Sequence, residues 1–256
     1  MHTATLNFSI HKKGNRERQV DGIYSLLGAL RMNGQILGTQ HPIAMSPVGY
    51  TSYVNTPEKS SLANKNSNNY VKLALELITD IGLFQPIITI IGKEPECSKL
   101  CSCTNSSSYF LYTTYITLES PIKCGTCFGV VPLYKIPKQY EEEYYNIICW
   151  QSDYQSCDSL QMNSTVGERF ATNQLSNISS KLTTSGLEVC ESIRKASKKD
   201  VYYYLYKGSG RNHTSELSRL CPNCNGSWFL EKSIHNIFNF MCKKCHLLSN
   251  IAWNCQ

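Results

Sequence analysis

The sequence predicts an α+β protein in which helices pack on a mixed sheet, followed by a small zinc ribbon at the C-terminal end. Two observations predict this fold class. In the first 96 positions, apolar residues switch between the period of two that is typical of strands and the longer period of helices. Near the other end, two CxxC pairs have the spacing of a tetrahedral four-thiolate zinc site. Hydrophobic residues make up 41% of the chain, which is enough for a sizeable core.

The first 96 residues predict a sheet with helices on one face. Residues 3–10 alternate apolar and polar side chains, as a half-buried strand does. One apolar stripe indicates a helix that ends near Asn33 and Gly34, and a second indicates a helix that Gly82 stops. The apolar run at 86–91 predicts a buried strand. The expected order is strand, helix, strand, helix and strand, at residues 3–10, 18–37, 41–55, 69–81 and 86–91.

The middle of the chain predicts a strand, then helices, then another strand. Residues 109–118 are an apolar strand within a Cys- and Ser-rich stretch. Helical patterns follow at 140–145 and 166–199, and Gly186 is expected to break the second into two helices. Four tyrosines within 202–206 predict a strand. The expected division is 1–96 as an α+β domain, 97–137 as a Cys-rich insert, 138–207 as a helical segment with a strand, and 208–256 as the zinc ribbon.

The predicted ribbon depends on two matched cysteine pairs. Each CxxC turn places two sulfurs on one side of a metal ion, and a short hairpin between the turns brings them together. Because four sulfur ligands leave no position for water, we expect a structural site. Four unligated thiols are the alternative, and His235 and His246 are close enough in sequence to be ligands instead. The expected ligands are Cys221, Cys224, Cys242 and Cys245.

A second set of cysteines predicts another metal site in the body of the chain. A CxC turn at 101–103 is followed, after the twenty residues 104–123, by a CxxC turn at 124–127. The alternative is a redox dithiol at Cys124 and Cys127. A thioredoxin-like motif normally precedes a helix, whereas residues 128–134 are strand-like, so a structural metal is favoured. The expected ligands of this second zinc ion are Cys101, Cys103, Cys124 and Cys127.

Patterns of catalysis are missing from the sequence, and we expect a protein that is not an enzyme. The six histidines include no HExxH spacing, and there is neither a GxSxG elbow nor a glycine-rich phosphate loop. The consecutive acids at 141–143 point in different directions on a helix and indicate a solvated face. A catalytic Cys–His nucleophile pair remains an alternative, because its two residues can be distant in sequence.

Composition indicates a cytoplasmic protein without a membrane segment. The first ten residues are too short and polar for a signal peptide, and no stretch reaches the roughly 18 apolar residues of a spanning helix. Thirteen cysteines, an odd number, in a chain without an export signal indicate thiols and metal rather than disulfides.

The net charge of +6 is compatible with a nucleic-acid partner but does not require one. From residue 221 onward, three lysines against one glutamate give a net charge of +2. Lys243 and Lys244 lie in the second CxxC turn, where they could contact phosphate. Phosphate binding normally uses several cations on one surface, and the other basic runs, at 11–18 and 194–199, are distant in sequence.

Four stretches, at residues 30–38, 120–134, 202–206 and 242–250, are specific enough to carry a resemblance. They resemble a bacterial family of unknown function that is described as Zn-ribbon-containing and as a candidate for nucleic-acid binding. The resemblance implies that the C-terminal CxxC pairs are ribbon ligands, and it strengthens the second cysteine set as a metal site. Some such proteins also resemble immunity proteins of secreted bacterial toxins.

Three functions follow as hypotheses. The first is an immunity protein that neutralises a cognate bacterial toxin by occluding its active surface. It fits the missing catalytic pattern and the sixteen tyrosines, because Tyr often anchors interfaces. The second is an RNA- or DNA-binding protein that uses the ribbon with Lys243 and Lys244. A redox enzyme that uses Cys124 and Cys127 is a third.

Overall fold

The structure is a computed structural model that describes residues 1–140 and 143–255. Two of the acids expected on a helix, Glu141 and Glu142, lie outside the described residues. None of the described helices is long and apolar enough to cross a lipid bilayer. The chain forms two compact units, of which unit 1 contains 1–99, 118–120 and 132–136, and unit 2 contains, of the described residues, 100–117, 121–131, 137–140 and 143–255.

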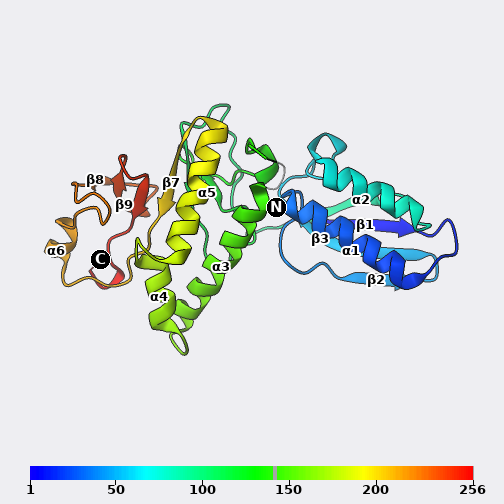
Figure 1. The fold of residues 1–256 in the computed structure, drawn as a ribbon, viewed down its shortest axis with the longest axis horizontal. Coiled ribbons are helices and arrows are strands. Elements are labelled where there is room, and N and C mark those ends of the chain that lie inside the picture. The colour runs from blue at the N-terminus through cyan, green and yellow to red at the C-terminus, as the bar shows by residue number, and fades with distance from the viewer. Residues whose placement is uncertain (141–142, 256) are drawn as a thin grey trace. The chain divides into compact units, whose positions relative to one another are not determined.

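Unit 1 is a four-stranded antiparallel sheet with two helices on one face (Figure 1). Its strand order is β2-β3-β1-β4, and every neighbouring pair is antiparallel. This connection of two βαβ halves through a β2–β3 hairpin is the ferredoxin-like topology. The elements are β1 (His2–Ser9), α1 (Arg16–Met32), β2 (Ile43–Ser46), β3 (Gly49–Thr56), the short 3₁₀ turn Asn64–Asn66, α2 (Asn69–Asp80), β4 (Ile87–Lys93) and the 3₁₀ turn Leu133–Lys135.

Both helices of unit 1 begin at an asparagine cap. The side chain of Asn15 accepts a hydrogen bond from Arg18 N, and that of Asn68 accepts one from Val71 N. Each cap satisfies a backbone N–H that has no partner within the helix. After α2, the backbone of Gly82 is left-handed, with a φ of 87°. A residue with a side chain would be strained in this conformation. The predicted helices and the stop at Gly82 are therefore confirmed.

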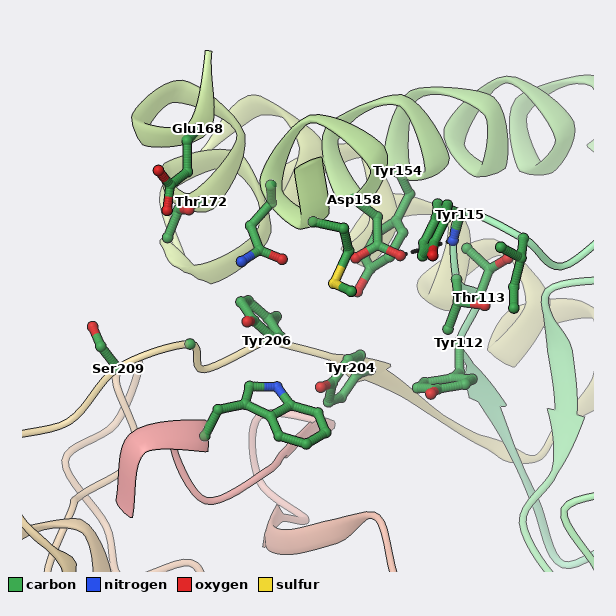
Figure 2. Close-up of a pocket in the computed structure, with 16 residues that line it drawn as sticks. Tyr112, Thr113, Tyr115, Tyr154, Asp158, Glu168, Thr172, Tyr204, Tyr206 and Ser209 are labelled. Carbon is green, nitrogen blue, oxygen red and sulfur yellow. Dashed lines mark hydrogen bonds between the residues drawn. The ribbon is translucent and has the colours of Figure 1, made fainter. Parts of the chain in front are cut away.

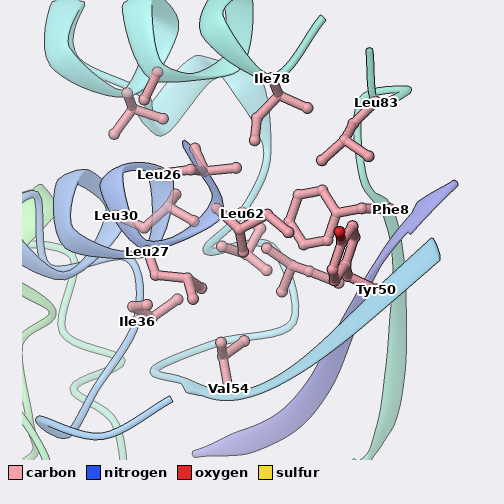
Figure 3. Close-up of a cluster of buried hydrophobic side chains, with 14 of the residues drawn as sticks. Phe8, Leu26, Leu27, Leu30, Ile36, Tyr50, Val54, Leu62, Ile78 and Leu83 are labelled. Carbon is pink, nitrogen blue, oxygen red and sulfur yellow. The ribbon is translucent and has the colours of Figure 1, made fainter. Parts of the chain in front are cut away.

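The core of unit 1 lies between the helices and the sheet. Alternate residues of β1 are buried, as the period of two predicted, and they meet the apolar stripe of α1. Figure 3 shows the leucines of α1 facing the strand side chains Phe8 and Tyr50. Tyr50 Oη also donates a hydrogen bond to the buried side chain of Gln19. The core therefore lies on one face of the sheet, and the helices leave the other face uncovered.

Two strand predictions in unit 1 were wrong in detail. The single strand expected at 41–55 is a hairpin, in which β2 and β3 pair about a turn at 47–48. The strand expected to be buried at 86–91 is β4, an edge strand whose Ile87 and Ile91 are 67% and 57% exposed. A continuous apolar run is compatible with either position, because burial depends on which elements cover the strand.

Unit 2 contains a mixed six-stranded sheet, which confirms the predicted mixed sheet. Its strand order is β6-β5-β7-β10-β9-β8, with β7 parallel to both of its neighbours and the other pairs antiparallel. The strand expected at 109–118 is shorter, because the chain leaves the sheet after Leu111. The strands are β5 (Ser108–Leu111), β6 (Ile122–Cys124), β7 (Asp200–Tyr204), β8 (Phe229–Ile234), β9 (Phe238–Cys242) and β10 (Leu247–Ser249).

Three helices of unit 2 pack against one another, and one of them, α5, packs on β7 (Figure 1). Residues 166–199 do form two helices, but the break expected at Gly186 is at 177–180 instead. Ser180 caps the second helix there by accepting from Thr183 N. The helices are α3 (Glu143–Asn163), α4 (Glu168–Ser176), α5 (Lys181–Ser197) and the short α6 (His213–Leu217), and a 3₁₀ turn spans Trp253–Cys255.

Gly186 lies inside α5, where its missing side chain lets the helix approach β7 closely. A Cβ atom there would overlap the ring of Tyr203 and lie 2.6 Å from Trp150 Nε1. Tyr203 is fully buried, so neither neighbour can move outward easily. The glycine is therefore a packing requirement rather than a helix stop.

We predict that Gly186→Ala lowers the free energy of unfolding of the protein by about 1–3 kcal/mol, because the core has no space for the methyl group. Urea unfolding followed by Trp fluorescence measures the change. Gly28→Ala in α1 is the control: a Cβ atom there meets nothing within 4 Å, so the higher helix propensity of alanine should leave stability unchanged or raised. Equal stability of Gly186→Ala and the parent would contradict this packing.

Candidate metal centres

Unit 2 brings the eight cysteines predicted as ligands into two groups of four. In each group, the four Sγ atoms lie within 4.8 Å of one another. Sulfurs placed tetrahedrally at about 2.3 Å from a zinc ion would be about 3.8 Å apart, so each group is of the size that one ion needs. The body group is Cys101, Cys103, Cys124 and Cys127, and the C-terminal group is Cys221, Cys224, Cys242 and Cys245.

The body group forms because two distant segments share hydrogen bonds. Cys124 is the last residue of β6 and is fully buried, whereas Cys127 is exposed in the following turn. Cys101 N donates a hydrogen bond of 2.9 Å to Val130 O, which holds the CxC segment beside the residues that follow the CxxC turn. The backbone, rather than the sulfurs alone, therefore places the four thiols together.

The C-terminal group lies at one end of the β9–β10 pair. Cys242 ends β9, and β10 begins two residues after Cys245. The Sγ atoms of Cys224 and Cys242 are 3.7 Å apart, close to the tetrahedral separation. Asn223 Nδ2 donates to Cys245 Sγ at 3.4 Å, as a second-shell donor to a ligand thiolate does.

All three CxxC turns have the same backbone. The residue after the second cysteine is left-handed in each: φ is 57° at Phe128, 55° at Asn225 and 53° at His246. In each turn, the backbone of the first cysteine pairs with the backbone of the residue five positions later, which is Gly129, Gly226 or Leu247. A left-handed non-glycine residue is costly, so its recurrence indicates one turn that aims both sulfurs to the same side.

Each group combines an acidic thiol with one that is held protonated. Burial opposes ionisation of Cys124, but Ser106 and the backbone N–H groups of Cys127 and Thr126 outweigh it and lower the pKa of Cys124 to about 6. The backbone N–H of Gly226 and then Cys245 lower the pKa of Cys224 to about 7.

The opposite shift occurs at one other thiol of each group. Burial raises the pKa of Cys101 to about 12, with the backbone of Cys103 opposing the shift and the neighbouring thiols adding to it, and burial also raises the pKa of Cys242 to about 12. A second thiolate beside the first is therefore disfavoured until a cation neutralises the group. Metal binding would displace these protons, as it does in other thiolate sites.

The turn at Cys124 and Cys127 differs from a redox motif. All thirteen cysteines are free thiols. In a thioredoxin-like site the CxxC precedes a helix, whose N-terminus stabilises the thiolate. Here the turn follows β6 and leads through the left-handed Phe128 to the isolated bridge between Lys123 and Val130. This arrangement can hold a metal ion among four sulfurs, and it lacks the helix that redox chemistry uses.

A histidine from the β8–β9 turn links the two cysteine-bearing regions. His235 Nε2 lies 2.9 Å from the carbonyl oxygen of Gly125, inside the turn of the body group. The His235 ring also stacks on Phe128, with centroids 5.0 Å apart. Phe110 and Phe238 complete this aromatic cluster. His235 therefore packs against the body group, a role that its position in the sequence did not indicate.

The structure also brings the basic end of α5 beside the last CxxC turn. Lys243 and Lys244 are exposed in that turn. His246, directly after it, contacts Arg194 of α5 at 3.3 Å and Asp200 at 3.2 Å. The sequence separates the run at 194–199 from the lysine pair, so only the fold shows that they belong to one region.

Comparisons with known proteins match most of the chain. A Haemophilus influenzae protein described as an uncharacterized protein is 32% identical over 246 residues, which are 94% of each chain. The chain belongs to its family. A second uncharacterized protein of that organism is 36% identical over 165 residues, which are 64% of this chain and 81% of the relative. Three family models also match, each described as a domain of unknown function: DUF8589 at 1–92, DUF2310 at 103–206 and DUF8594 at 210–255.

We predict that the purified protein carries two metal ions per chain, because both groups have complete ligand sets. Cys103→Ser and Cys224→Ser should each remove one ion, as measured by elemental analysis against protein concentration. Cys149→Ser, which changes a half-buried thiol outside both groups, should leave two. A content of one ion that only Cys224→Ser abolishes would show that the body group holds none.

Proposed function

We propose that each cysteine group holds one zinc ion, and that the C-terminal group together with β8–β10 forms a zinc ribbon. Thiolate ligands in a tetrahedral arrangement favour zinc over the harder cations. A four-sulfur site has no open position for water or substrate, so the ions would be structural. Their contribution would be to hold the turns that the short strands cannot hold alone.

We further propose that the protein is a non-catalytic binding protein whose partner is another protein. The observation that carries this proposal is the uncovered face of the unit 1 sheet. Its outward residues alternate with the buried core residues and carry no charge. They include Thr5, Tyr53 and Thr89 in one cross-strand row. Nucleic acid needs cations to neutralise phosphate, whereas an uncharged surface with aromatic and aliphatic groups suits a protein.

The edge strand β4 adds a means of attachment. β4 pairs only with β1 among the described strands, so its other side presents backbone N–H and C=O groups. Its isoleucines Ile87 and Ile91 are largely exposed, an unusual feature for an edge. A partner strand could extend the sheet here and cover them. An immunity protein for a cognate bacterial toxin is the specific form of this proposal.

We expect Ile87→Lys with Ile91→Lys to weaken binding to the toxin encoded beside the gene by at least about tenfold, because charges would replace the apolar anchors of the interface. Co-purification and survival on co-expression with the toxin measure this. Leu73→Lys is the matched control, since Leu73 is 61% exposed and lies on α2 rather than on a strand of the sheet. Full protection by the double variant would exclude β4 as the interface, and no protection by the parent would exclude the immunity role.

Nucleic-acid binding is a second candidate, supported by the contact of Arg194 with His246. This contact places the cations at the C-terminal end of α5, which are Arg194, Lys195 and the capping residue Lys198, in the region of Lys243 and Lys244. Glu191 pairs with both Arg194 and Lys195 and reduces the local charge. Several cations on one surface are what phosphate binding requires.

If this second candidate holds, RNA or DNA retention should fall steeply with salt, since each phosphate contact releases counterions. Lys198→Glu with Lys243→Glu should reduce the slope of log affinity against log salt by about two, one for each lost contact. Lys72→Glu, an exposed lysine on α2, is the control for net charge. Equal retention by the double variant and the control would reject this surface.

A further inference from the structure

Unit 2 contains a cavity of about 630 Å³ that is separate from both cysteine groups. It lies between the α3–α4 pair on one side and the segments after β5 and β7 on the other (Figure 2). Trp253, in the 3₁₀ turn near the C-terminal end, also lines it. Small-molecule sites usually have volumes of about 300–1,000 Å³, so the cavity is of the size of a ligand site.

Aromatic side chains make up six of the sixteen residues that line the cavity. Five tyrosines and one tryptophan line the cavity, from four separate segments of the chain. Tyr154 and Tyr204 are buried, whereas Trp253 is 63% exposed at the opening. The rings of Tyr112 and Tyr204 lie 5.1 Å apart. The six are Tyr112, Tyr115, Tyr154, Tyr204, Tyr206 and Trp253.

The cavity has the opposite charge to the rest of the protein. Its lining includes two carboxylates, Asp158 and Glu168, and among the described residues that line it there is no Lys, Arg or His. The whole chain, by contrast, has a net charge of +6. Anions such as nucleotides are therefore disfavoured in the cavity, and cations are favoured.

Asp158 is the charged group that most needs a partner. It projects from α3 among the tyrosines, and Oδ2 accepts a hydrogen bond of 2.7 Å from Tyr115 N (Figure 2). No cationic side chain pairs with Asp158 in the part of the chain that the structure describes. Burial raises the pKa of this carboxyl, with the Tyr115 hydrogen bond opposing the shift. Asp158 is half-buried. A partly desolvated carboxylate without a counterion is unfavourable, and a bound cation would offset that cost.

We propose that this cavity binds a small organic ammonium ion, with its charged head against Asp158 and its apolar body on the tyrosine rings and Trp253. The ring faces attract a cation through their quadrupoles, and the carboxylate supplies the full opposite charge. An inorganic cation would not use the apolar wall, and a neutral ligand would leave Asp158 unpaired. The site is independent of the protein- and nucleic-acid-binding surfaces proposed above.

Calorimetric titration of the full, metal-loaded chain tests this proposal, with Trp fluorescence as a second readout. The probes are choline, as a quaternary ammonium, and spermidine, as a chain of protonated amines. Binding of choline alone, spermidine alone or both supports the proposal and identifies which kind of ammonium group fits. The uncharged carbon analogue of choline should bind at least about tenfold more weakly than choline, because it cannot pair with the carboxylate.

Asp158→Asn should weaken binding by at least about tenfold, since it removes the charge while an amide oxygen of the same size can still accept from Tyr115 N. Asp153→Asn, an exposed position on the same helix and outside the cavity lining, should bind as the parent does. Trp253→Leu changes an exposed side chain and should weaken binding by about threefold or more without affecting the fold.

The proposal is overturned if neither choline nor spermidine binds at millimolar concentration. It is also overturned if Asp158→Asn, shown by circular dichroism to be folded, binds as tightly as the parent. Tighter binding of adenosine monophosphate than of either ammonium ion would reverse the assignment of ligand charge.

Discussion

The architecture of unit 2 depends on β7, which pairs in parallel with β5 on one side and with β10 on the other. Through β7, the strands beside the body group and those beside the C-terminal group become one sheet. α5 can approach β7 because Gly186 leaves space for the ring of Tyr203. The contact of His235 with Gly125 joins the same two regions a second time. Both cysteine-bearing regions are therefore parts of one continuous sheet.

The polar chemistry of unit 2 is divided among places with different tasks. Each cysteine group gathers four sulfurs, which could hold a metal ion. The end of α5 and the last CxxC turn present cations, whereas the aromatic cavity presents Asp158 without a counterion. A net charge of +6 averages over these regions and hides the anionic cavity. The charge of each region is therefore visible only when the fold shows which charged residues lie together.

Unit 1 shows how one sheet can be both a stable core and an open surface. The buried residues of β1 and β3 face α1 and α2, and the residues between them face outward. Cross-strand hydrogen bonds such as Thr51 Oγ1 to Asn7 Oδ1 satisfy polar groups on the outward face without charges. That face carries no charged side chains, and β4 adds apolar side chains at its edge.

Local periodicity and spacing determined much of this protein from the sequence alone: the helices of unit 1, the mixed α+β composition and both sets of four cysteines. These features depend on neighbouring residues, and a CxxC turn has the same form wherever it lies. The edge position of β4, the place of Gly186 inside α5 and the cavity around Asp158 were decided only by the tertiary structure. The order of strands depends on how whole elements pack and on long crossovers such as that from β7 to β10. The residues next to an apolar run or an aspartate in the sequence do not indicate which elements the tertiary structure packs against it.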